Sequence, residues 1–132
     1  MSELEVALRR EFARAVRYRQ HISVLLVDVP PTADVLGNVR DAVRLCDSAV
    51  PASTDRVAVI LPETQLGGAL VVATRLAGAL GPSPVTGRPQ SVGVAAYPSP
   101  SVADAEALMR AAEKALDIAR SHGGGVMTPV LR

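Results

Sequence analysis

The sequence predicts an α/β fold in which helices pack against a small mixed β-sheet. Helical and strand patterns alternate along the 132 residues, in the order helix, strand, helix, strand, helix, strand, helix, strand. Apolar residues make up 48% of the chain, but the aromatic ones are only Phe12, Tyr18 and Tyr97. Ala, Val and Leu must therefore fill the core, and such small side chains suit helix-on-sheet layers. The length is that of one domain, and no repeat or linker divides residues 1–132.

Four helices are expected where apolar residues recur every three or four positions. The first covers residues 3–19, with Leu4, Leu8 and Phe12 on one face. The second starts at a cap, either Thr32 or Asp34, and runs to about residue 46. The fourth runs from about residue 102 to 121. The third is capped by Thr64, and its expected inner stripe is Leu66, Leu70, Ala73, Ala77 and Leu80.

Four strands are expected where short aliphatic runs end at proline or glycine. They are residues 22–29, 56–61, 91–96 and 126–128. The first is almost wholly aliphatic, as expected for a strand buried on both faces. Prolines at 30, 31 and 62 end two of the runs, because proline has no N–H for the ladder. The three glycines at 123–125 follow a helix and are expected to form its C-cap and turn.

Charge and cysteine content exclude several classes of function. The net charge is +1 with acidic and basic residues interspersed, which predicts neither a nucleic-acid partner nor an anionic membrane partner. Cys46 is the only cysteine, so no internal disulfide forms, and we expect it to be a buried, inert thiol. No apolar run approaches membrane-spanning length and the N-terminus is no signal peptide. We expect a soluble, cytoplasmic domain.

Four segments, in this order, carry a resemblance to one family. They are residues 25–28 (Leu-Leu-Val-Asp), 61–64 (Leu-Pro-Glu-Thr), 91–95 (Ser-Val-Gly-Val-Ala) and 112–123. The last segment is the end of an expected helix together with the glycine that follows it. Together they resemble a GGDEF-type diguanylate cyclase domain. The resemblance implies a ferredoxin-like nucleotidyl cyclase sandwich with a mixed central sheet flanked by helices. It also aligns the five positions of the catalytic signature with Ser53, Thr54, Asp55, Arg56 and Val57, of which only Asp55 matches the signature.

The departures from the family pattern predict that the domain is not an enzyme. A cyclase holds two divalent metals, and such cations need several oxygen ligands. Asp28 supplies one carboxylate, but Pro30 and Arg56 stand where the family has acidic residues. The guanine-binding stretch is too short, and Gly124 replaces a phosphate-binding arginine. We expect no cofactor, with Mg²⁺ only where nucleotide binding persists. Asp28 is then either the residual metal candidate or a cap for the turn that follows it.

An RxxD pattern lies upstream of the altered signature. Asp47 and Arg44 precede Ser53 by six and nine residues, and Arg75 follows it by twenty-two. In the family these offsets belong to an inhibitory site that binds cyclic di-GMP. An arginine fork matches the acceptors of guanine or a phosphate, and a carboxylate matches the guanine donors. The alternative interpretation is a solvated ion pair at a helix end, which contributes little.

Three functions follow as hypotheses. The first is a catalytically inactive GGDEF-like signalling domain, with cyclic di-GMP bound through Arg44, Asp47 and Arg75. The second is a ligand-free scaffold that binds a protein partner, or forms a homodimer, through the N-terminal helix. The third is an active diguanylate cyclase, which the missing metal and phosphate ligands disfavour.

Overall fold

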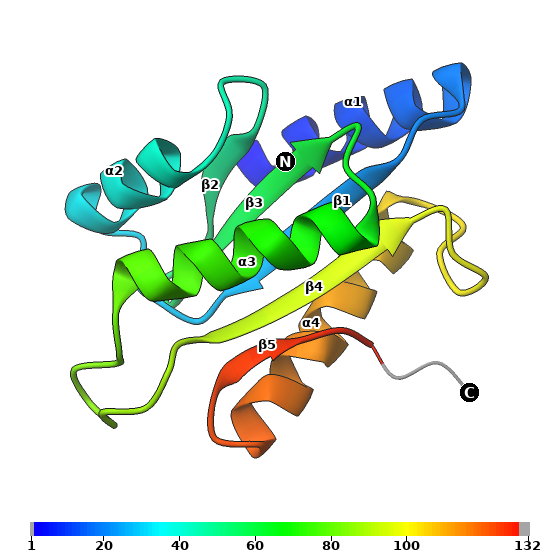
Figure 1. Cartoon of the computed structure of the whole chain (residues 1–132). Coiled ribbons are helices and arrows are strands. Elements are labelled where there is room, and N and C mark those ends of the chain that lie inside the picture. Colours follow the sequence, from blue (N-terminus) through cyan, green and yellow to red (C-terminus); the bar gives the residue numbers. More distant parts are fainter. Residues whose placement is uncertain (1, 130–132) are drawn as a thin grey trace.

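The computed structural model describes residues 2–129, and these form one mixed sheet with helices on both faces (Figure 1). The strand order is β2-β3-β1-β4-β5, and all neighbours are antiparallel except β4 and β5. This architecture confirms the expected helix-on-sheet fold. In chain order the elements are α1 (Glu3–Tyr18), β1 (Ile22–Val27), α2 (Ala33–Ala42), β2 (Ser48–Ser53), β3 (Arg56–Pro62), α3 (Leu66–Leu80), β4 (Ser91–Tyr97), α4 (Ala105–Ser121) and β5 (Gly125–Met127).

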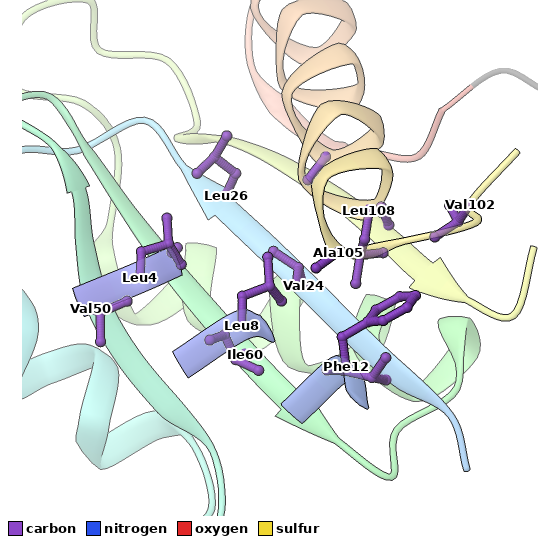
Figure 2. Close-up of a cluster of buried hydrophobic side chains, with 14 of the residues drawn as sticks. Leu4, Leu8, Phe12, Val24, Leu26, Val50, Ile60, Val102, Ala105 and Leu108 are labelled. Atoms are coloured by element: carbon purple, nitrogen blue, oxygen red, sulfur yellow. The ribbon is translucent and has the colours of Figure 1, made fainter. Parts of the chain in front are cut away.

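The strand β1 is buried on both faces because its side chains alternate between two cores. Val24 and Leu26 belong to the core under α1 and α4, where Figure 2 shows them with Leu8 and Leu108. Their neighbour Leu25 points to the opposite core, under α2 and α3. The aliphatic run that predicted this strand therefore reflects a position at the centre of the sheet. The candidate site lies where β1 ends.

The strand β2 was not predicted, and its composition explains why. It lies at the sheet edge, contains Pro51, and shifts register against β3 between Pro51 and Ser53. Only Ala49 and Val50 of its side chains are buried. An edge strand tolerates proline because one side of its backbone has no ladder partner. Its residues therefore lack the aliphatic run that marks the inner strands.

The predicted end of α2 and the predicted burial of Cys46 are both wrong. The helix ends at Ala42, and Val43 adopts extended backbone angles of φ −122° and ψ 170°. Residues 43–47 then turn toward β2, which leaves Cys46 exposed. A helix continued to residue 46 would have placed the thiol against the core. The turn instead carries it into solvent.

The helix starts and the inner face of α3 also differ in part from expectation. Thr32 is the cap of α2, and its hydroxyl accepts from the Val35 N–H at 3.2 Å. The helix α3 starts after Gln65, which makes no side-chain cap, and α4 starts after Asp104. Of the predicted inner stripe of α3, Ala73 is buried, Leu70, Ala77 and Leu80 are partly buried against the core, and Leu66 is exposed. The other fully buried positions, Ala69 and Leu76, were not predicted. Because α3 is apolar nearly all round, its sequence pattern does not define one inner face.

No helix of residues 2–129 is long and apolar enough to span a membrane.

Candidate functional site

The end of β1 brings Asp28 beside residues from three other segments. The last register pairs set Val27 opposite Val57 of β3 and Val92 of β4. The next positions are therefore Asp28, Arg56 and Ser91, and the Asp28 N–H donates to Ser91 O at 3.0 Å. Arg56, at the signature position, thus starts β3 next to the position of Asp28.

The Asp28 carboxylate forms an ion pair with Arg120 near the end of α4. Arg120 Nε lies 3.4 Å from Asp28 Oδ2, and the Asp28 side chain is 28% exposed. Within residues 2–129 the carboxylate makes no hydrogen bond to the turn at Thr32, whose N–H donates to Pro30 O instead. The capping interpretation of Asp28 is therefore wrong. A guanidinium group faces this carboxylate.

A polar pocket of about 240 Å³ opens at this end of the sheet. We call it the Asp28 pocket, and its lining residues are Asp28, Ser83, Thr86, Arg88, Pro89, Gln90, Ser91, Arg120, Gly123 and Gly124. The loop between α3 and β4 supplies Ser83, Thr86 and Arg88, which the sequence alone did not place at this end of β1. Only folding brings that loop against the α4–β5 turn.

The glycines after α4 are required by backbone angles and by close packing against that loop. Gly123, Gly124 and Gly125 have φ of 86°, 109° and 100°, which confirms the predicted turn. A Cβ at Gly124 would lie 2.2 Å from Pro89 O, and one at Gly123 would lie 3.4 Å from Arg88 Nη1. The guanidinium of Arg88 therefore lies beside Gly123 in the lining of the pocket.

The donors at this end do not fit the two divalent metals that the resemblance implies. Residues 2–129 hold no group of three or more His, Cys, Asp or Glu side chains able to bind a metal ion. Asp28 offers one carboxylate, while Arg88 and Arg120 line the same pocket and Arg56 begins the neighbouring strand. Mg²⁺ requires several oxygen ligands in a near-octahedral arrangement.

Arg44 and Asp47 meet in the turn between α2 and β2. Arg44 Nη2 lies 3.2 Å from Asp47 Oδ1, Arg44 Nε lies 3.4 Å from Oδ2, and the Arg44 backbone N–H donates to Oδ2 at 2.9 Å. The Asp47 side chain is 1% exposed, whereas that of Arg44 is 57% exposed. The carboxylate is thus enclosed by its own turn. It is not a solvated partner at a helix end.

Arg44 also reaches the turn between β3 and α3. Its Nη2 donates to Pro62 O at 3.0 Å and to Thr64 Oγ1 at 2.7 Å. The hydrogen bond that Arg44 donates to the Asp47 carboxylate, and then the charge of that carboxylate, raise the pKa of Arg44 above its ordinary value, so the side chain stays cationic. These contacts tie two turns together that are about twenty residues apart in sequence. We call this set, Arg44, Asp47, Pro62 and Thr64, the Arg44 clamp.

Arg75 lies apart from the clamp. It is an exposed residue of α3, about 14 Å along the helix axis from Leu66 at a rise of ~1.5 Å per residue. In the described part of the chain no hydrogen bond or ion pair joins it to Arg44 or Asp47. The structure therefore brings two of the three predicted residues into contact.

The altered signature forms a plain hairpin turn. Ser53 ends β2, Arg56 begins β3, and the Asp55 N–H donates to Ser53 Oγ at 3.2 Å. Asp55 is exposed and serves as a turn residue, as its residue type favours.

Solved structures with the same fold are GGDEF domains. The GGDEF domain of YfiN (TpbB) from Pseudomonas aeruginosa is 21% identical with a TM-score of 0.83, covering 98% of this chain and 94% of that one. The active GGEEF domain of a diguanylate cyclase from Vibrio cholerae is 16% identical with a TM-score of 0.83, covering 96% and 94%. The GGDEF domain of DgcB from Caulobacter crescentus, solved in complex with c-di-GMP, is 16% identical with a TM-score of 0.76, covering 94% and 86%.

No protein-family model and no curated protein matches the sequence. The identities to the solved domains are all below 25%, so what is shared is the arrangement of strands and helices. The chain has the GGDEF-type, nucleotidyl cyclase-like fold that its four motifs predict.

Proposed function

We propose that this chain is a catalytically inactive GGDEF-like signalling domain. The observation that carries the proposal is the ion pair of Asp28 with Arg120. A cyclase needs carboxylates at this strand end to hold the metals that activate the triphosphate. Here the Asp28 carboxylate is paired with the Arg120 cation, and the neighbouring signature position holds Arg56. The positive charge of a metal would be repelled from the place where it is needed.

We expect no formation of cyclic di-GMP from GTP with either Mg²⁺ or Mn²⁺. The reason is that one carboxylate cannot hold two hard cations against three guanidinium groups. Chromatography of the nucleotide products after long incubation measures this directly. Turnover that an Asp28→Ala variant abolishes would contradict the proposal, whereas turnover equal in the variant and the parent would point to a contaminating enzyme.

The sharper form of the proposal is binding of cyclic di-GMP through Arg44, Asp47 and Arg75. It is supported by the exposure of the Arg44 side chain, 57%, and by the exposed position of Arg75. The Arg44 guanidinium can donate outward to guanine or phosphate acceptors while Asp47 holds it in place. Arg75 must then approach from α3, because the described contacts do not join it to the clamp.

We expect cyclic di-GMP to bind and an Arg75→Ala variant to weaken binding by about tenfold, the loss of one charge-assisted contact. Isothermal titration calorimetry gives both affinities. Arg75→Ala is the clean variant, since Arg75 has no ion pair in the described residues and its removal leaves the fold intact. Arg110→Ala, an exposed arginine on α4, is the matched control. No heat of binding at high micromolar ligand would rule out this form.

A second candidate function is protein binding or homodimerisation through α1. Val6, Val16 and Tyr18 of this helix are 49%, 48% and 58% exposed, while Leu4, Leu8, Phe12 and Ala15 are buried. Exposed apolar side chains on one helix favour a docking surface. Light scattering over a range of protein concentrations distinguishes a dimer from a monomer.

A further inference from the structure

A second pocket opens at the end of the sheet opposite the Asp28 pocket. The strand β1 begins there at Ile22, which pairs with Tyr97 at the end of β4, and β5 runs parallel to β4. The start of α3 and the loop after β4 lie at this same end (Figure 1). The pocket has a volume of about 410 Å³ and is lined by residues 65–67, 95–96, 98–102 and 128–129, with His21 and Ala111. We call it the α3 pocket.

Most of the lining of the α3 pocket is apolar, and part of it belongs to the domain core. Ala95 of β4 and Val102 are buried in the core under α1 and α4, and Ala111 of α4 packs against that core. Leu66 and three prolines complete the apolar part of the lining. The volume lies within the ~300–1,000 Å³ of sites that enclose small molecules. The packing of the core therefore fixes the shape of this part of the pocket.

Polar side chains from four segments complete the lining. His21 precedes β1, Gln65 precedes α3, Ser99 and Ser101 follow β4, and Thr128 follows β5. Within residues 2–129 none of these side chains makes a hydrogen bond or an ion pair. Their donors and acceptors are therefore available to a polar group in the pocket.

The α3 pocket differs from the Asp28 pocket in charge. Among the described residues no Asp, Glu, Lys or Arg side chain lines it, whereas Asp28, Arg88 and Arg120 line the pocket at the other end of the sheet. Moving a charged group out of water is costly unless an opposite charge and hydrogen bonds compensate for the lost hydration. The lining of the α3 pocket therefore favours an uncharged ligand.

We infer that the α3 pocket binds an uncharged, mainly apolar compound with one polar group, such as an aromatic amide. The ring contacts the apolar part of the lining, and the polar group forms hydrogen bonds with the polar side chains. The inference goes beyond the proposed signalling function, because this pocket shares no residue with the Asp28 pocket or with the Arg44 clamp. It requires neither a nucleotide nor a metal.

The test is two-dimensional NMR of the isotope-labelled whole chain, titrated with four probes that share one ring. Indoleacetamide is uncharged, indoleacetate is an anion, tryptamine is a cation, and methylindole lacks the amide. We expect indoleacetamide to shift the backbone signals of Gly67, Ala96 and Ala111 with a Kd of about 1 mM or tighter. Both charged probes are expected to bind about tenfold more weakly, because the lining offers them no opposite charge. Methylindole is expected to bind several-fold more weakly, because it leaves the polar side chains unpaired.

Ala111→Leu tests the location of the site. The larger side chain fills part of the pocket, and we expect it to weaken indoleacetamide binding by about tenfold or more. Ala79→Leu, at an exposed position of α3 outside the lining, is the matched control and leaves the affinity unchanged. Gly67→Leu decides the question if Ala111→Leu does not fold. A Cβ at Gly67 has nothing within 4 Å, so the fold tolerates this change.

Three results would overturn the inference. They are an absence of shifts at about 5 mM indoleacetamide, equal affinities for the charged and uncharged probes, and an unchanged affinity in the folded pocket variants. None of these results concerns GTP turnover or cyclic di-GMP binding. A failure of this inference is therefore distinguishable from a failure of the proposed function.

Discussion

Gly93→Ala is expected to lower the free energy of unfolding by about 3 kcal/mol or more. Gly93 lies in β4 where α4 crosses it, and a Cβ there would stand 2.3 Å from Ala112 O and 2.4 Å from Leu116 N. Both are backbone atoms of α4, so no side-chain rotation can relieve the overlap. The helix must move off the sheet, which opens the packing of the core on that face. Urea denaturation followed by circular dichroism measures the loss.

Gly78→Ala is the matched control for this substitution. Gly78 lies in α3, is exposed, and has nothing within 4 Å of the position of an added Cβ. The change should stabilise the protein by about 0.5–1 kcal/mol, because alanine favours the helix interior. A Gly93→Ala protein as stable as the parent would show that the contact between β4 and α4 is not as close as described.

Arg44→Ala is expected to cost about 2–3 kcal/mol of stability through loss of the Arg44 clamp. The substitution removes the side-chain bonds to Asp47, Pro62 O and Thr64 Oγ1. It also leaves the Asp47 carboxylate, 1% exposed, with the backbone N–H of residue 44 in place of its charged partner. The effect stays below that of a fully buried pair because the Arg44 side chain is itself 57% exposed. Thermal and urea unfolding give the difference.

Arg14→Ala serves as the control, since Arg14 is exposed on α1 and its loss should change stability by less than about 0.5 kcal/mol. Arg44→Lys should fall between the parent and Arg44→Ala, because an ammonium group cannot reproduce the fork. Equal stability of Arg44→Ala and Arg14→Ala would show that the clamp contributes nothing. Because Arg44→Ala is expected to destabilise the fold, a loss of ligand binding in this variant can come from unfolding. Arg75→Ala does not remove a contact of the clamp, so its effect on binding can be interpreted directly.

The sequence predicted the helices, the inner strands and the fold family well, since each depends on a local pattern. The aliphatic run of β1 marks a strand buried on both sides, and the apolar spacing of α1 marks its inner face. The motifs around Asp28 and Ser91 predicted the shared architecture in their order along the chain. The edge strand β2 was not predicted, because it contains Pro51 and is mostly exposed, and so lacks the aliphatic run that marks the inner strands.

The candidate sites depended on contacts between residues that are distant in sequence. Spacing alone predicted that Arg44 and Asp47 could act together, but whether they face solvent or each other depends on the turn after α2. No local sequence pattern predicts the hydrogen bond between Arg44 and Thr64, because it joins two turns that only the folded sheet brings together.

The same holds for the Asp28 pocket. The residue types of Asp28, Arg56 and Arg120 could be read from the chain, and their chemistry already argued against a metal centre. The position of Arg88 could not be predicted from the sequence, because a loop rich in glycine, proline and polar residues has no periodicity that fixes its direction. Its path is set by the fit against Gly123 and Gly124, whose missing side chains let two backbones approach. Local periodicity thus specifies elements, and the packing of distant backbones specifies which charges meet.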